Sequence, residues 1–100
     1  MYTPLPPCLT IKKSDIHGLG IFATSNIYSG CDLGIAHVKL PGFPQGYCRT
    51  PLGGFYNHSD EPNCKLIDSY EYNLSVKRLV TIKDIAVGEE LTCKYTLYSL

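Results

Sequence analysis

Structure-breaking residues in the middle of this 100-residue chain limit its possible folds more than any other feature. Residues 39–54 carry prolines at 41, 44 and 51 and glycines at 42, 46, 53 and 54. Proline removes a backbone donor and glycine adds conformational entropy to the unfolded chain, so long regular elements cannot cross this segment. We therefore expect a loop-rich middle with short elements on either side.

Three strands are predicted before the middle. Leu9–Lys13 alternates apolar and polar residues, as a half-buried strand does. After a loop over residues 14–20, residues 21–24 form a short apolar run. Residues 33–38 are apolar apart from a glycine and a histidine. Alternation with these short lengths favours strands over helices.

Three further strands are expected after the middle, over residues 64–67, 72–85 and 91–95. A turn is predicted near residues 68–69, and a bulge between Val76 and Leu79, where the apolar positions change phase. Gly88 predicts the last turn. No window has helical periodicity beyond a turn or two, so the predicted fold class is mostly β, with residues 1–100 in a single domain.

Charge argues against nucleic acid as a partner. Nine basic and nine acidic residues cancel, so the chain lacks the broad positive field that non-specific nucleic-acid binding needs. Four acids gather around residues 55–71, where they would either attract a basic peptide or form ordinary solvated loops: Asp60, Glu61, Asp68 and Glu71.

The cysteines indicate an intracellular protein. Their number, five, is odd, and no Cys-x-x-Cys pair occurs, which argues for reduced thiols. The first residues lack the basic start and long apolar run of a signal peptide, and no segment is long enough to span a membrane. We expect no membrane partner and no bound metal.

Residues 55–64 hold more chemistry than any other ten residues. They combine two asparagines, a histidine, two acids and a proline directly after Gly53 and Gly54. Such residues define local backbone geometry while leaving polar atoms exposed, so this turn is suited to holding a ligand or another chain segment. A cysteine–histidine nucleophile lacks a third orienting group, and the cysteine and histidine spacings lack the close pairs of structural zinc sites.

Three motifs occur in a specific order. They are Gly-x-Gly at residues 18–20, Asn-His-Ser-x-x-Pro-Asn at residues 57–63, and Gly-Glu-Glu-Leu-Thr-x-x-Tyr at residues 88–95. In this order they resemble the SET-domain family of protein lysine methyltransferases, in a minimal form that covers about residues 11–95. The resemblance implies several small β-sheets and a C-terminal segment that threads through a preceding loop.

The resemblance also implies a cofactor, S-adenosylmethionine. Gly18, Leu19 and Gly20 would approach it through their backbone. Asn57 would bind its methionine end, and His58 would meet its adenine mainly through main-chain atoms. The implied partner is a protein or peptide substrate that carries a lysine.

Tyr95 matches the catalytic tyrosine of the family. A phenol with an ordinary pKa near ~10 is a poor base at neutral pH, so its expected role is to orient the lysine amine. Candidates for the lysine channel are Tyr47, Tyr56 and Tyr98. Cys93 stands two residues before Tyr95, where a small side chain would permit more than one methyl group.

Two other interpretations remain open. The segment between Ile35 and Asn57 is shorter than is usual in the family, which favours a SET-like module that binds S-adenosylmethionine or a peptide without transferring methyl groups. A plain β interaction domain would leave three motif matches to coincidence. The lysine channel would be covered by Leu97, Tyr98 and Leu100 or by a second subunit, and we also expect a homodimer.

Overall fold

The computed structural model describes residues 5–40, 47–71 and 73–94 and confirms a mostly β chain. It contains eight strands and one short helix within these residues. In chain order they are β1 (Leu9–Lys13), β2 (Leu19–Ala23), β3 (Asp32–Lys39), β4 (Tyr47–Arg49), α1 (Pro51–Phe55), β5 (Asn57–His58), β6 (Cys64–Glu71), β7 (Leu74–Thr81) and β8 (Glu90–Cys93).

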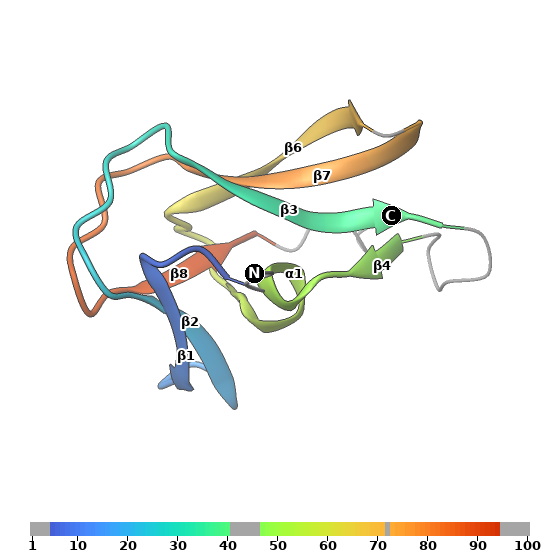
Figure 1. Cartoon of the computed structure of the whole chain (residues 1–100). Helices are drawn as coiled ribbons and strands as arrows, with labels where there is room; N and C mark the ends of the chain where they lie inside the picture. The colour runs from blue at the N-terminus through green and yellow to red at the C-terminus, as the bar shows by residue number, and fades with distance from the viewer. Residues whose placement is uncertain (1–4, 41–46, 72, 95–100) are drawn as a thin grey trace.

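The strands form small antiparallel units joined through β8. Their order is β1-β2-β8-β6-β7-β3-β4, and β5 pairs with β8 outside this path. The joints are short, since among the described residues β8 pairs with β2 at two positions and with β6 only through Cys93 and Cys64. Figure 1 shows β3, β6 and β7 as a long twisted layer, β1 and β2 on the opposite side, and β8 and α1 between them.

The predicted turn near residues 68–69 is wrong. Asp68 and Ser69 belong to β6 and pair with Lys77 and Val76 of β7. The pairing continues as far as Glu71 with Leu74, and Asn73, just before β7, has a φ of 61°. The far end of this hairpin is largely exposed, so polar residues there are compatible with a strand and gave no sign of the true boundary.

The predicted bulge between Val76 and Leu79 is also wrong, because the irregularity lies in the neighbouring strand. β7 pairs with β6 in continuous register, whereas β3 has one extra residue between Asp32 and Gly34 and another between Ile35 and His37. The first extra residue accompanies the left-handed backbone of Gly34, whose φ is 120°.

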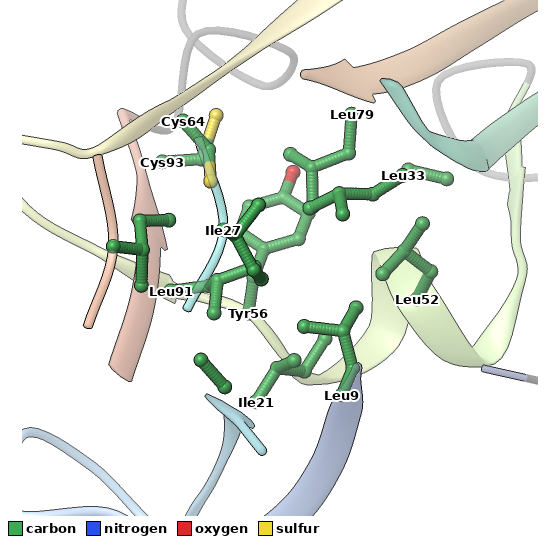
Figure 2. Close-up of a cluster of buried hydrophobic side chains, with 13 residues drawn as sticks. Leu9, Ile21, Ile27, Leu33, Leu52, Tyr56, Cys64, Leu79, Leu91 and Cys93 are labelled. Carbon is green, nitrogen blue, oxygen red and sulfur yellow. The ribbon is translucent and has the colours of Figure 1, made fainter. Parts of the chain in front are cut away.

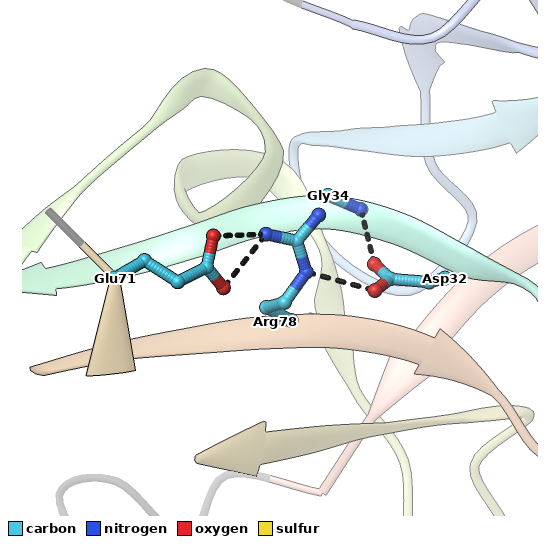
Figure 3. A network of polar contacts seen from close by, with 4 residues as sticks. All are labelled: Asp32, Gly34, Glu71 and Arg78. Atoms are coloured by element: carbon cyan, nitrogen blue, oxygen red, sulfur yellow. Dashed lines mark hydrogen bonds and ion pairs between the residues drawn. The ribbon is translucent and has the colours of Figure 1, made fainter. Parts of the chain in front are cut away.

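Arg78 ties this irregular part of β3 to the hairpin. Its Nε donates to Asp32 Oδ2 at 2.8 Å, and its Nη1 donates to both Glu71 carboxylate oxygens at 2.8 and 2.9 Å (Figure 3). The other oxygen of Asp32 accepts from the Gly34 backbone nitrogen at 2.9 Å. These bonds raise the pKa of the Arg78 guanidinium, chiefly through Asp32, so the pair remains ionised.

The loop-rich middle contains two short elements that its composition does not reveal, β4 and α1. The Thr50 hydroxyl accepts from the Gly53 nitrogen at 3.3 Å, and Pro51 occupies the first turn, where no backbone donor is needed. Gly53 is required for packing, since a Cβ there would lie 2.0 Å from the Ala36 carbonyl oxygen. Pro51 therefore starts a single helical turn, and Gly53 allows this turn to pack on β3.

The core lies between the two sheet units. Figure 2 shows side chains of β1 and β2 facing those of β3 and β7 across the ring of Tyr56, with β8 at one side. Its buried members come from nearly every element: Leu9, Ile21, Ala23, Ile27, Leu33, Ala36, Leu52, Tyr56, Cys64, Leu79, Ile85, Leu91 and Cys93. Apolar burial of this kind is the main stabilising contribution in a small domain.

One buried histidine, His37, contacts the ring of Tyr56 in the core. His37 is 0% exposed, and its Nε2 lies 3.0 Å from the Tyr56 hydroxyl, with the rings edge to face. Burial, with the nearby charges of Arg49 and Lys77, lowers the pKa of His37 to about 4. The histidine is therefore neutral at physiological pH.

Candidate functional site

The short strand β5 brings the second and third motifs together. It runs parallel to β8, with Asn57 opposite Thr92 and His58 opposite Cys93. The Ser59 nitrogen continues this contact by donating to the Cys93 carbonyl at 3.3 Å. Residues of the two motifs that are 35 positions apart in the sequence thus lie side by side.

The Gly-x-Gly motif at residues 18–20 and the turn before it, together called the glycine loop, contact β5 through Asn57. This side chain is buried, and its Nδ2 donates to the carbonyl oxygens of His17 and Leu19, each at 3.2 Å. The structure therefore brings Gly18 and the first residues of β2, Leu19 and Gly20, into direct contact with Asn57; the loop predicted over residues 14–20 ends at Gly18. Their role in cofactor binding stays a prediction.

Glu90 lies at the centre of this contact, and sequence reasoning does not single it out. Its carboxylate accepts from Asn57 Nδ2 at 2.7 Å and from the Ser14 hydroxyl at 2.8 and 2.9 Å. The Ser14 hydroxyl in turn accepts from the Ile16 nitrogen at 2.9 Å, which closes the turn after β1. The only sequence signal for Glu90 is its place in the third motif, where it reads as part of a turn.

Positions 18 and 20 of the Gly-x-Gly motif suit glycine for different structural reasons. Gly18 has a φ of 47°, a left-handed backbone that glycine adopts readily, and open space where a Cβ would be. At Gly20 a Cβ would lie 2.2 Å from Glu90 Oε2. Gly20 thus leaves room for the chain's own carboxylate, which is a separate reason from the backbone approach to a cofactor expected from the sequence.

Asn63 hydrogen-bonds the end of the turn at residues 55–64, called the central turn, to β8. Its Oδ1 accepts from the Thr92 nitrogen at 2.8 Å, and its Nδ2 donates to the Glu90 carbonyl at 2.8 Å. Nδ2 also donates to Glu89 Oε2 at 3.2 Å. Asn63 is buried, so these bonds are made away from water.

His58 presents its backbone to β8 and its ring toward Asp60. Nε2 lies 3.2 Å from Asp60 Oδ1, in a pair whose side chains are 38% and 88% exposed. Exposed ion pairs of this kind contribute little to stability. The predicted main-chain contact of His58 with adenine remains a prediction.

The remaining predicted site residues are only partly described. Tyr56 lies in the core with its hydroxyl on His37, so it forms part of the interior packing. Cys93 is 2% exposed, and burial raises the pKa of its thiol. The side chain of Tyr47 and all of Tyr95 and Tyr98 lie outside the described residues.

The predicted acidic region is weaker than its composition indicates. Asp68 forms an ion pair with Lys77, and Glu71 pairs with Arg78. Only Asp60 and Glu61 among the four acids stand at the central turn itself, because the other two lie along the β6–β7 hairpin. The steering of a basic peptide by all four acids together is therefore not supported.

All five cysteines are free thiols, and no group of three or more histidine, cysteine or acidic side chains in the described part of the chain could hold a metal ion. Over the same residues, the structure contains no helix with the length and apolar character needed to cross a membrane.

The fold and the motif arrangement define a SET-type β domain, and comparison with known families agrees. The SET domain family model matches residues 39–96, more than half of the chain. The chain therefore belongs to the SET domain family, as its three motifs predict. S-adenosylmethionine is the cofactor of this family.

Solved structures share this fold at low sequence identity. A candidate histone methyltransferase from Plasmodium falciparum is 21% identical with a TM-score of 0.74, over 90% of this chain and 94% of that one. The methyltransferase domain of human PR domain-containing protein 2 is 19% identical with a TM-score of 0.67, over 89% and 77%.

A third similar structure is much larger. It is the Chaetomium thermophilum Polycomb Repressive Complex 2 in an autoinhibited conformation bound to S-adenosylmethionine, with 19% identity and a TM-score of 0.71. The match covers 89% of this chain but 15% of that one. A search of curated proteins finds no match.

Proposed function

We propose that this chain is an S-adenosylmethionine-dependent methyltransferase that acts on a lysine side chain of a protein. The observation that carries the proposal is the meeting of the glycine loop, Asn57 and β8 around one polar cluster. β8 also leads directly to Tyr95, two residues beyond Cys93.

The residues present fit the charged end of S-adenosylmethionine. Asn57 Nδ2 is surrounded by three acceptors, so its amide oxygen is the atom left to meet a ligand, and no described residue donates to that oxygen. An amide oxygen is a suitable acceptor for the cofactor's ammonium group. Ile16, in the loop after β1, and Leu19, the first residue of β2, are each about half exposed and offer apolar contact.

The chain's own contribution to catalysis would be mainly geometric. When bound, S-adenosylmethionine supplies an activated methyl group. The lysine amine must be neutral to attack it, and with a pKa of about 10.4 this costs on the order of 4 to 5 kcal/mol at pH 7. Tyr95 would orient the amine, while exclusion of water and a nearby positive charge would lower its pKa.

Methyl number is part of the same proposal. Cys93 is small and buried next to the backbone that leads to Tyr95. A small side chain there would leave room for an amine that already carries a methyl group. We propose that transfer does not stop at the first methyl.

A module that binds S-adenosylmethionine or a peptide without transferring methyl groups is the second candidate. The observation that favours it is the short segment between Ile35 and Asn57, in which β4 and α1 are the only described elements after β3. This segment would contribute little surface to a peptide cleft.

The test combines calorimetric titration of S-adenosylmethionine with radiolabelled methyl transfer to a panel of basic proteins. We expect Tyr95→Phe to bind the cofactor as the wild type does and to lose about a hundredfold in turnover, by analogy with removal of one oriented donor. The control is Tyr70→Phe, on the exposed hairpin far from β8.

The outcomes separate the candidates. Full turnover in Tyr95→Phe would contradict the role of that tyrosine. Cofactor binding without transfer to any protein of the panel would favour the second candidate. Absence of binding in the wild type would overturn both.

A further inference from the structure

Glu90 joins three segments that are far apart in the sequence. Its carboxylate accepts from Ser14, just after β1, and from Asn57 in β5, and it occupies the space that a Cβ would take at Gly20 in β2. Ser14 and Asn57 are 8% and 6% exposed, so these bonds are made where water competes little. The side chain therefore does more than fill a turn.

The carboxylate determines which way the Asn57 amide points. An asparagine side chain has one donor end and one acceptor end of nearly equal shape, and its orientation follows from its neighbours. All three neighbours of Nδ2 are acceptors: Glu90 Oε2 and the carbonyl oxygens of His17 and Leu19. Reversing the amide would place its oxygen against three acceptors with no proton between them.

We propose that Glu90 is a positioning residue for the cofactor site, which orients the Asn57 amide so that its oxygen faces the cofactor's ammonium group. This inference rests on the proposed function for the identity of the ligand. The orientation of the amide itself is a property of the chain alone and can be tested without any ligand.

The glycine at position 20 is part of the same arrangement, because it leaves room for the Glu90 carboxylate. Because a Cβ there would lie 2.2 Å from Glu90 Oε2 and 3.2 Å from Asn57 Nδ2, any larger residue would displace the carboxylate. Gly20→Ala is thus a second way to separate Glu90 from Asn57, and it leaves the charge in place.

The main variant is Glu90→Gln, which keeps the shape of the side chain. Glutamine has one acceptor oxygen and no charge, so the bond to Asn57 Nδ2 is either lost or becomes a weaker neutral one. The matched control is Glu89→Gln, the same change one residue earlier, where the carboxylate contacts Asn63 and the Ala86 nitrogen instead.

The first measurement uses the ligand-free protein. We expect the side-chain amide signals of Asn57 in a ¹⁵N NMR spectrum to shift and to exchange faster with water in Glu90→Gln and in Gly20→Ala. In Glu89→Gln they should match the wild type. Unchanged Asn57 signals in a folded Glu90→Gln or Gly20→Ala protein would overturn the orientation argument.

The second measurement compares two ligands by calorimetry. S-adenosylmethionine should bind Glu90→Gln at least about tenfold more weakly, because the Asn57 amide loses the charged acceptor that holds its orientation. 5′-Methylthioadenosine lacks the ammonium group, and its affinity should change by less than about twofold, since the oriented oxygen has nothing to accept from it. Equal weakening of both ligands would show general damage and overturn a specific positioning role.

This design separates the two proposals. If the wild type binds S-adenosylmethionine and Glu90→Gln binds it equally well, Glu90 has no positioning role while the proposed function stands. If the wild type binds neither ligand, the proposed function fails, and the NMR comparison still decides whether Glu90 orients Asn57.

Discussion

At the scale of single residues, His37 shows how a polar side chain can belong to an apolar core. It stands in the bulged part of β3, is fully buried, and meets the Tyr56 hydroxyl at 3.0 Å. A buried neutral imidazole can accept or donate this bond, whereas its protonated form would place a charge in the core beside Arg49 and Lys77. Folding is therefore linked to the protonation of this one residue.

We expect the protein to lose stability in mild acid because of His37. Its pKa falls from 6.5 in the unfolded chain to about 4 in the folded one, so the unfolded state takes up the proton first. The contribution of neutral His37 to the free energy of unfolding should be fully present above about pH 6.5. The free energy of unfolding should then fall by about 3 kcal/mol as the pH drops to 4. Urea unfolding at pH 7, 5.5 and 4.5 measures this.

His37→Gln is the control for that experiment. Glutamine has an amide that can reach the Tyr56 hydroxyl and has no charge to gain in this range. The variant should lose most of the decline between pH 6.5 and 4. An equal decline in the variant would assign the acid sensitivity to other groups.

At the scale of elements, the site depends on β8 and on the turn that precedes β6. β8 has few ladder bonds of its own with β2 and β6. Asn63 adds side-chain bonds to the Thr92 nitrogen and the Glu90 carbonyl, both in β8. The central turn therefore has two ends with different tasks: Asn57 faces the glycine loop, and Asn63 holds the strand that leads to Tyr95.

We expect Asn63→Ala and Asn57→Ala to differ in kind. Asn63→Ala leaves buried backbone groups of β8 without partners, which should lower the free energy of unfolding by about 1–3 kcal/mol per group left unpaired. Asn57→Ala should chiefly weaken S-adenosylmethionine binding. Thermal unfolding and calorimetric titration of both variants measure the two effects, and similar profiles for both would contradict this division.

At the scale of the whole molecule, two sheet units are joined through one short strand. The β1–β2 unit and the β3–β4–β6–β7 unit each have antiparallel ladders of their own, and β8 pairs with both. The core fills the space between the units, so their relative position depends on packing more than on hydrogen bonds.

The homodimer predicted from the sequence also belongs at this scale and stays a prediction. The residues expected to close the lysine channel lie outside the described part of the chain. We expect light scattering to give twice the chain mass of 11.1 kDa, because a second subunit would cover apolar surface at the channel mouth. A monomeric mass at working concentration would remove the homodimer.

Much of the fold was predictable from local pattern. Leu9–Lys13 is a strand with the predicted bounds, β3 extends the predicted strand by one residue at each end, and Gly88 is a turn with a φ of 86°. The boundary of β6 was not predictable, because its exposed end has no apolar alternation to mark it. The threading of the C-terminal segment falls on residues outside the described ranges.

By itself, the sequence determined the β class, the family and the members of the three motifs, because alternation and motif spacing are local properties of the chain. Only the tertiary structure decided that Glu90 lies against Gly20 and Asn57, and that Tyr56 belongs to the core with His37. These contacts join residues up to 76 positions apart, as Ser14 and Glu90 are. No local pattern reports such distances, since strand pairing and side-chain packing alone bring those residues together.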